Sequence, residues 1–356
     1  MILTIFIVFI IFFGLIIIHE FGHFILAKKF GARVEEFGIG FPPRLLGKKI
    51  GETIYSLNLL PLGGFVRIYG EEGGIEDYRS FTGRPIWQRY LIILGGVIAF
   101  WIIAAVILSV VAGGWGVPVA ITDETDLGDQ LVNPQIQITK VHAATSAEEM
   151  GLMPGDVITG FEKTNNFKEF IKENQGKEIT LNIKRGGEIL EKKGKIGESL
   201  GVEFYRTARK IYPWYLAPWA GIETAAHYTS NIVYSWMVVG GWALGLSELP
   251  EGIEEEDVAI MGPVGIFALL GEFFEIGTDA FLRLVALIAI ALALVNILPI
   301  PALDGGRIVF LTVEAVRGKP VNYKIEQKIN TAFFYLLVGL MIFITLRFDI
   351  PGLLSN

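Results

Sequence analysis

The sequence contains no cysteine and only four histidines among its 356 residues. The lack of cysteine excludes disulfide bonds and thiolate metal ligands, so histidine and carboxylate side chains would have to hold any zinc ion. Charged residues make up only 19% of the chain, and the net charge of −7 argues against a nucleic-acid partner. Hydrophobic residues reach 52% and the mean hydropathy is +0.51, which indicates a membrane protein that also carries polar regions.

The N-terminal stretch has no charged side chain from Met1 to Ile18 and is long enough to form most of a membrane-spanning helix. It also lacks the basic start of a signal peptide, and the residues around Ala27 make a poor cleavage site. We therefore interpret residues 1–27 as an uncleaved membrane anchor.

The motif His19-Glu20-Phe21-Gly22-His23 lies near the inner end of this anchor. Residues four apart on a helix lie one turn apart on the same face, so the two histidines can reach one metal ion. Glu20 points about a quarter-turn away, where it suits the role of a general base toward water. A solvated helix could carry these residues by chance, but polar groups next to a long uncharged run are costly and usually functional. The motif predicts a metal site with a third ligand from elsewhere in the chain.

Three further stretches are predicted to cross the membrane, at 90–113, about 281–298 and 331–346. The segment 28–90 carries ten lysine and arginine residues, several of them close to the two neighbouring spans. By the positive-inside rule this segment is cytoplasmic, which puts the N-terminus outside and the histidine motif near the inner leaflet.

Two regions have the pattern of β structure. The β-prone stretch Thr53–Leu59 lies between Gly- and Pro-rich runs, which predicts a hairpin over about 35–68. This hairpin could be a plain surface element or a sheet edge beside the active site. Residues 117–204 show strand-like runs at 136–141, 156–161 and 179–183, and Met150–Ile158 matches the GLxxGDxI signature of PDZ domains. An unrelated small β domain is the alternative for this second region.

The segment 205–250 combines basic and aromatic residues with an uncharged run at 231–247, a composition suited to the lipid headgroup layer. Six acidic residues between Glu248 and Asp257 follow it and are expected to form a solvated loop.

The number of spans decides which acid can join the histidines. If 231–247 lies at the interface, the third span runs inward and brings Asp304 to the inner leaflet, whereas Asp279 and Asp349 fall outside. If 231–247 crossed the membrane, Asp304 would emerge roughly 30 Å away, although a zinc ligand bond is only about 2 Å long. We therefore predict four spans, both termini outside and Asp304 as the third ligand.

The order of these motifs along nearly the whole chain resembles the site-2 protease family of membrane zinc metalloproteases, in its bacterial RseP-type branch. The motifs are HEFGH in the first span, GxGFxP and PLGGFVR in the hairpin, FTGRPIWQR at 81–89, the PDZ signature, GPVGI at 262–266 and NxxPxPxLDGG at 296–306. Two features depart from the family. The stretch Gly95–Phe100 lacks the asparagine that is usual there, and the chain has room for one PDZ domain where the best-known members carry two.

The resemblance implies a polytopic α-helical membrane protein with four transmembrane helices, a membrane-associated β-hairpin and an inserted extracytoplasmic PDZ domain of the β-rich α+β class. The expected regions are a first unit with two spans and the hairpin at 1–113, the PDZ domain at 114–204, an interfacial helical region with the acidic loop at 205–280, and the last two spans with the LDGG motif at 281–356.

The resemblance also implies one Zn²⁺ per chain, held by His19, His23 and Asp304, with Glu20 as general base. The residues that it implies for substrate binding are Asn296, Pro299 and Pro301 near the third span and Gly38, Gly40, Gly63 and Gly64 in the hairpin.

The expected activity is cleavage of single-span membrane proteins within or near their transmembrane segment, as in regulated intramembrane proteolysis. Expected substrates are proteins of the anti-sigma-factor type after a first cleavage, or remnant signal peptides, and the PDZ domain would bind peptide C-termini. The expected location is the inner (cytoplasmic) membrane, as a multi-pass protein with the active site toward the cytoplasmic leaflet. A catalytically silent scaffold that binds peptides and a metal transporter are the alternatives. A scaffold should lack Glu20 or a ligand, and none is missing. A transporter needs charged or metal-binding groups along several spans, whereas the second and fourth spans have none.

Overall fold

The computed structural model describes residues 2–71, 77–128, 130–142, 144–185, 187–197, 199–250 and 261–355. Most of the acidic loop predicted between Glu248 and Asp257 lies outside these ranges. The chain divides into two compact units. The first comprises Met1–Ile107, Glu223–Phe274 and Arg283–Asn356, and the second comprises Leu108–Ile222 and Glu275–Leu282.

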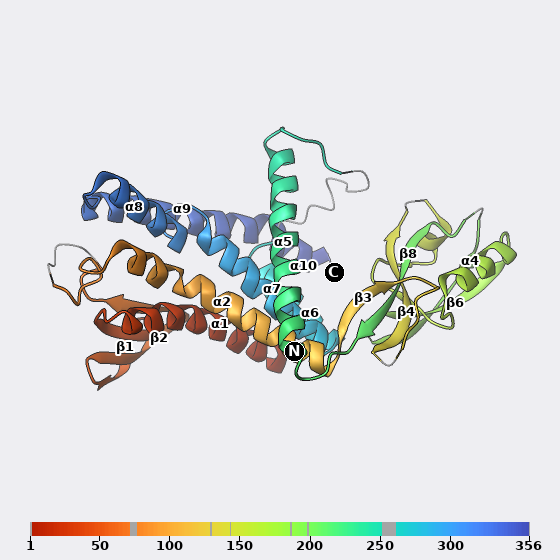
Figure 1. The fold of residues 1–356 in the computed structure, drawn as a ribbon. Helices are drawn as coiled ribbons and strands as arrows, with labels where there is room; N and C mark the ends of the chain where they lie inside the picture. Colours follow the sequence, from red (N-terminus) through yellow and green to blue (C-terminus); the bar gives the residue numbers. More distant parts are fainter. Residues whose placement is uncertain are drawn as a thin grey trace. The chain divides into compact units, whose positions relative to one another are not determined.

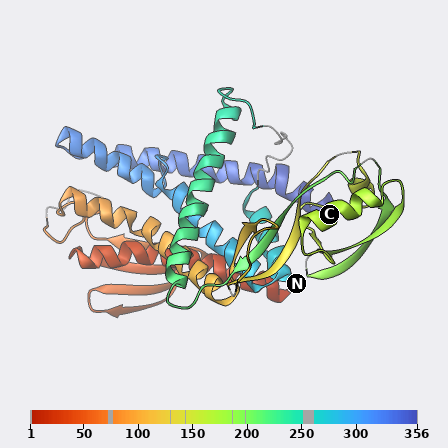
Figure 2. The same ribbon diagram turned by 45° about the vertical axis from the view of Figure 1, so that its right-hand side comes forward.

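Four helices in the described part of the chain are long and apolar enough to cross a membrane, as the sequence predicts. They are α1 (Ile2–Lys29), α2 (Ile86–Gly114), α7 (Thr278–Ile297) and α9 (Tyr323–Ile344). Within the first unit these helices run roughly side by side, and α5 (Ala217–Ala243) crosses them (Figures 1 and 2). Although α5 carries most of the uncharged run 231–247, it is not among the four.

The first helix ends where its sequence changes from apolar to basic. Lys28 and Lys29 occupy the last turn of α1, where positive charge is favourable at the negative end of the helix dipole. The chain then leaves the helix through Gly31, whose φ of 76° lies in the left-handed region that favours glycine.

The backbones of α1 and α2 touch at two glycines. A Cβ atom added to Gly22 would overlap the carbonyl group of Gly95, and one added to Gly95 would overlap the backbone of Gly22. Small residues allow such close crossing of membrane helices. The contact brings α2 directly against the turn of α1 that carries the two histidines.

The two strands β1 (Val34–Ile50) and β2 (Thr53–Ile68) form a hairpin that contacts α1. Phe37 on β1 is paired with both Tyr55 and Val66 on β2, so the two halves of β2 lie on opposite sides of the first half of β1. The second half of β2, residues 64–68, pairs only with β1 among the described strands. We call residues 64–68 the edge strand, because its other side is not paired with a strand.

The second unit contains a six-stranded sheet in the order β3-β8-β4-β5-β6-β7. The strands are β3 (Val117–Ile121), β4 (Leu131–Val141), β5 (Val157–Ile158), β6 (Glu178–Arg185), β7 (Glu188–Lys195) and β8 (Val202–Lys210). Helices α3 (Ser146–Glu149) and α4 (Thr164–Glu173) complete it. Its core includes Ile136, Ile158, Phe167 and Ile183, all at most 2% exposed.

Two acids, of which Asp156 is buried, stabilise loops of this sheet domain. Asp156, in the GLxxGDxI stretch, accepts a hydrogen bond from the Met153 amide and pairs with Arg185 at 2.7 Å, which raises the pKa of the arginine. Asp123, which follows β3, accepts hydrogen bonds from the backbone amides of Thr164 and Asn165 at the start of α4. Asp156 of the GLxxGDxI stretch therefore has a structural role in its own loop.

Four short helices complete the described part of the chain. They are α6 (Pro263–Ile276), α8 (Asp304–Arg317), a π-helical turn at Thr345–Asp349 and α10 (Ile350–Ser355). The buried Asp349 accepts a hydrogen bond from the Gly262 amide at 2.8 Å, just before α6 begins. The GPVGI motif thus marks the start of a helix, and a carboxylate accepts a hydrogen bond from the amide of the residue that precedes this helix.

Candidate active site and metal centre

Three side chains from opposite ends of the chain meet in the first unit. The Nε2 atoms of His19 and His23 lie 3.2 Å apart on α1. Oδ2 of Asp304, the first residue of α8, lies 3.4 Å from Nε2 of His19 and 3.3 Å from Nε2 of His23. In the described part of the chain this is the one group of three or more His, Asp or Glu side chains close enough to share a metal ion.

The spacing of these three atoms fits a tetrahedral zinc ion. Zinc binds histidine nitrogen and carboxylate oxygen at about 2.0–2.1 Å, so two ligands of one tetrahedral ion lie about 3.3–3.4 Å apart. The three measured distances, 3.2 to 3.4 Å, agree with that value. Both His23 and Asp304 are only 8% exposed.

The hydrogen bonding around the group also favours a cation. Nδ1 of His23 lies 2.9 Å from the carbonyl oxygen of Ile92, and only a protonated Nδ1 can donate to it. In the neutral ring Nε2 then carries a lone pair that points toward Asp304. Oδ2 of Asp304 is buried and accepts no hydrogen bond. Two lone pairs facing each other away from water repel, and a metal ion between them relieves that repulsion.

Helix α2 forms one wall of this group. A Cβ atom added to Gly96 would overlap the rings of both histidines, so only glycine fits there. One turn later, Phe100 stacks on the imidazole of His19 with 4.7 Å between ring centroids and 28° between ring planes. Neither residue is among the site residues predicted from the sequence. The only signal was the departure from the family pattern at Gly95–Phe100, which says nothing about which side chains face α1.

Glu20 lies beside these three side chains in a small cavity of about 80 Å³, which we call the metal cavity. His19, His23, Asp304 and Arg307 also line it. The edge strand borders the same space. A Cβ atom added to Gly64 would lie 3.1 Å from Cγ of Glu20, and Val66 and Ile68 also line the cavity. An acid, three side chains at the spacing of metal ligands and an open strand edge therefore meet in one place.

The turn between α7 and α8 delivers Asp304 to this cavity. A Cβ atom added to Gly305 would overlap the carbonyl oxygens of Ile297 and Leu298, and one added to Gly306 would overlap the backbone at Ile300 and Pro301. Because both glycines pack against the preceding turn, α8 can start immediately after it. The local reason for the two glycines in LDGG is thus steric.

The three residues near the end of α7 that are predicted to bind substrate lie outside this cavity. Asn296, in the last turn of α7, donates a hydrogen bond to the carbonyl oxygen of Leu292 at 2.9 Å, and Pro299 is exposed in the turn that follows. Pro301, also in that turn, packs against Gly306. None of the three lines the metal cavity.

Of the four hairpin glycines, only Gly64 borders Glu20. Gly38 and Gly63 make room for the rings of Phe65 and Phe41, and Gly40 has a φ of 80°. For these three the structure supplies a packing or backbone reason and no contact with the metal cavity.

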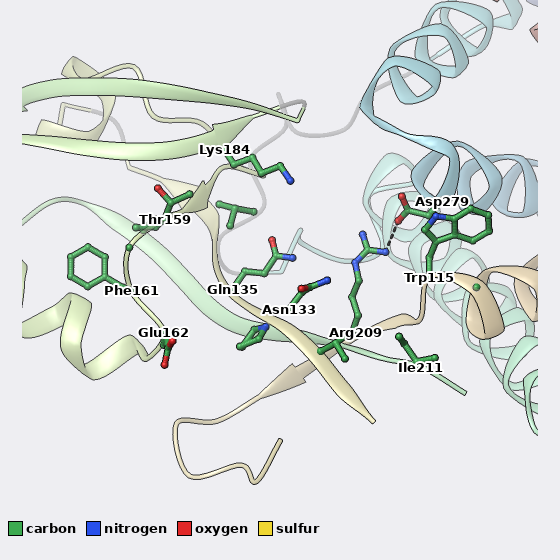
Figure 3. Close-up of a pocket in the computed structure, with 16 residues that line it drawn as sticks. Trp115, Asn133, Gln135, Thr159, Phe161, Glu162, Lys184, Arg209, Ile211 and Asp279 are labelled. Atoms are coloured by element: carbon green, nitrogen blue, oxygen red, sulfur yellow. Dashed lines mark hydrogen bonds and ion pairs between the residues drawn. The ribbon is translucent and has the colours of Figure 1, made fainter. Parts of the chain in front are cut away.

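Another cavity, in the second unit, holds none of the predicted site residues. It measures about 860 Å³, and Figure 3 shows Arg209 and Asp279 in it, joined by an ion pair of 2.6 Å. Asp279 is therefore engaged with a strand of the sheet domain. The candidate active site therefore lies in the smaller cavity, because that cavity contains the residues suited to catalysis.

Comparison with known protein families identifies the family of this chain. The sequence pattern of peptidase family M50 matches residues 7–340, nearly the whole chain. The chain belongs to this family. M50 peptidases depend on zinc, so the protein is a membrane zinc metalloprotease, and the expected activity is confirmed at that level.

Several relatives of this M50 peptidase match it over almost its full length. A protein of Clostridium acetobutylicum named as a zinc metalloprotease is 33% identical over 340 residues, which are 94% of this chain and 93% of the relative. The regulator of sigma-W protease RasP of Bacillus subtilis is 30% identical over 424 aligned residues, 93% of this chain and 96% of the relative. The chloroplastic membrane metalloprotease ARASP of Arabidopsis thaliana is 29% identical over 366 residues, 94% of this chain and 76% of the relative.

Proposed function

We propose that this M50 peptidase cleaves single-span membrane proteins within or near their transmembrane segment, with His19, His23 and Asp304 as zinc ligands and Glu20 as general base. The observation that carries the proposal is the convergence of one carboxylate and two imidazoles at ligand spacing, with a second carboxylate in the same cavity. All four groups belong to elements of one unit that are apolar enough for a membrane or directly follow such a helix.

Bound zinc would supply a Lewis acid that polarises the scissile carbonyl and makes water a better nucleophile at neutral pH. Glu20 takes the proton from the attacking water and then gives it to the leaving amide nitrogen. The small, mostly buried cavity keeps bulk water away from these charges and so strengthens their interaction with the reacting groups.

The edge strand offers a site for the substrate backbone. A helical substrate must unwind before its carbonyl groups become accessible, and unwound backbone in a membrane needs new hydrogen-bond partners. Addition of the substrate as a strand along residues 64–68 would satisfy its amides and place it beside Glu20. Asn296 is proposed as a further partner at the end of α7, with Pro299, Pro301 and the hairpin glycines shaping the same substrate path.

The sheet domain is proposed to be an extracytoplasmic PDZ domain that binds peptide C-termini. β3 pairs with Arg206–Lys210 of β8, so the part of the outer β8 edge that remains for a peptide is Val202–Tyr205. Four residues suit a short free chain end better than an internal loop. The hairpin is proposed to associate with the membrane, since Leu45, Leu46 and Ile50 are all more than half exposed at its tip.

The protein is proposed to lie in the inner membrane with both termini outside and its active site toward the cytoplasmic leaflet. The support is the basic segment 28–90 and the four apolar helices. The name of the B. subtilis relative, a regulator of sigma-W protease, supports substrates of the anti-sigma-factor type.

The test replaces Glu20 with Gln, which keeps the size of the side chain and removes its basicity. We expect the variant to retain one zinc ion per chain and to lose cleavage of a single-span substrate by at least about 100-fold, the lower end of what general acid–base catalysis contributes. Substrates should then accumulate on the variant in the native membrane, where crosslinking and mass spectrometry identify them. Full cleavage by the variant would refute the role of Glu20.

A further inference from the structure

An ion pair lies in the wall of the metal cavity and connects the hairpin to the helix that begins with Asp304. Glu71 follows the end of β2, and its carboxylate pairs with the guanidinium group of Arg307 on α8. Both residues line the cavity, yet neither is a proposed ligand or base. They also line a second small cavity of about 70 Å³, so the pair stands between two cavities.

Glu71 is fixed to the last residue of the edge strand. Its Oε2 accepts a hydrogen bond from the Ile68 amide at 3.3 Å, and its own amide donates to the Ile68 carbonyl at 3.2 Å. Gly70, with a φ of 71°, allows the tight turn between them. The other carboxylate oxygen, Oε1, is the one that pairs with Arg307. One side chain therefore holds the strand end with one oxygen and α8 with the other.

The two ends of this connection are the parts that catalysis must keep aligned. Gly64, Val66 and Ile68 alternate along the edge strand and share the face that borders Glu20. On α8, Arg307 lies three residues after Asp304 and thus on the same side of the helix. The ion pair joins the strand proposed to bind substrate to the helix that carries a proposed zinc ligand.

The ion pair is partly shielded from solvent, so it can contribute to the stability of this region. The side chains of Arg307 and Glu71 are 36% and 18% exposed. Removing one partner of a partly buried pair costs more than the loss of an exposed pair.

We propose that Arg307 and Glu71 are positioning residues that hold the edge strand at the correct distance from the metal site, so that a substrate strand added there meets Glu20. This proposal rests on the proposed function of the same site. A displacement of about 1 Å in a positioning element can cost about 100-fold in rate, so a single ion pair can set substrate binding without touching the substrate.

The test is a charge swap. Glu71→Arg and Arg307→Glu should each lower kcat/KM by about 10- to 100-fold, mainly through KM, for a synthetic single-span peptide in detergent. The double variant Glu71→Arg/Arg307→Glu should return to within about threefold of the wild type, because it restores the pair with the charges exchanged. All variants should keep one zinc ion per chain.

A matched control is Arg317→Glu, which makes the same charge change at the exposed far end of α8. It should leave kcat/KM within about twofold of the wild type. If the charge reversals fail to fold, Glu71→Gln and Arg307→Gln replace them. Each should weaken binding of the peptide about tenfold, and the two together should be no worse than either alone.

Hydrogen exchange of the amides at 64–68 provides a readout that needs no substrate. We expect faster exchange in each single variant and a return to wild-type rates in the swap. The proposal would be overturned if the single variants had wild-type kcat/KM and wild-type exchange rates. It would also be overturned if the double variant were no better than either single variant, or if the single variants lost zinc in proportion to their loss of activity. If the wild type does not cleave at all but the exchange pattern is as expected, the positioning role stands and the proposed function fails.

Discussion

Replacing Gly96 with alanine is a sharp test of how α2 shapes the metal site. The added methyl group would occupy the space now filled by the rings of His19 and His23, with His23 Nε2 only 2.5 Å from the new carbon. A Cβ atom does not come this close to another non-bonded atom in a folded protein. Either the rings must rotate away from Asp304 or α2 must move. The second option is blocked one residue earlier, because the backbones of Gly95 and Gly22 already touch.

The size of the effect follows from the ligands that move. Changing a group that only orients a ligand costs about 10- to 100-fold in metal affinity. Gly96→Ala displaces two proposed ligands directly, so we expect at least about a 100-fold loss of zinc affinity, or about 2.7 kcal/mol. The assay is competition with a chelator of known affinity, followed by metal analysis of the purified protein.

Gly14→Ala is the matched control, because a Cβ atom at Gly14 on α1 meets nothing within 4 Å. Alanine is favoured over glycine in a helix by about 1 kcal/mol, so this variant should be as stable as the wild type or more so, with unchanged zinc affinity. Zinc affinity of Gly96→Ala within about threefold of the wild type would refute the packing described here.

Three further predictions concern the surroundings of the site and the second unit. Phe100→Ala should lower zinc affinity by about tenfold, since it removes the ring that stacks on His19, whereas Phe100→Tyr should keep most of it; chelator competition measures both. Asp349→Ala should leave the Gly262 amide unpaired and cost about 1–3 kcal/mol, seen as faster hydrogen exchange at the start of α6 with normal zinc content. Asp123→Ala should cost about 1 kcal/mol by removing hydrogen bonds at the start of α4, with faster exchange at Thr164 and Asn165 and no change in zinc binding; unaltered exchange there would contradict the capping role.

The parts of the fold that depend on short-range pattern could be predicted from the sequence. The uncharged run before His19 gives a helix, and the spacing of His19 and His23 puts both on one face of it. The proximity of Asp304 followed from counting spans, because only an even number of crossings after the first brings residue 304 back to the histidines. The structure places these three side chains together, while their assignment as zinc ligands stays a prediction.

The sequence could not predict the features that depend on where two distant segments touch. Gly96 and Phe100 face the histidines because α1 and α2 cross at Gly22 and Gly95, and the crossing point is not encoded in either helix alone. The pairing of Glu71 with Arg307 joins residues more than two hundred positions apart, and no local pattern marks either residue as a partner. The same holds for Asp349, whose role is decided by the amide of Gly262.

We propose that His19, His23 and Asp304 together hold one zinc ion. X-ray absorption at the zinc edge of the purified protein tests it most directly, with Asp304→Ala and His19→Ala measured beside the wild type. We predict one zinc ion per chain, with two imidazole ligands and only nitrogen or oxygen atoms bound to it. His19→Ala should lose one imidazole ligand, and Asp304→Ala should bind zinc far more weakly. One tightly held zinc with an unchanged spectrum in either variant would contradict it.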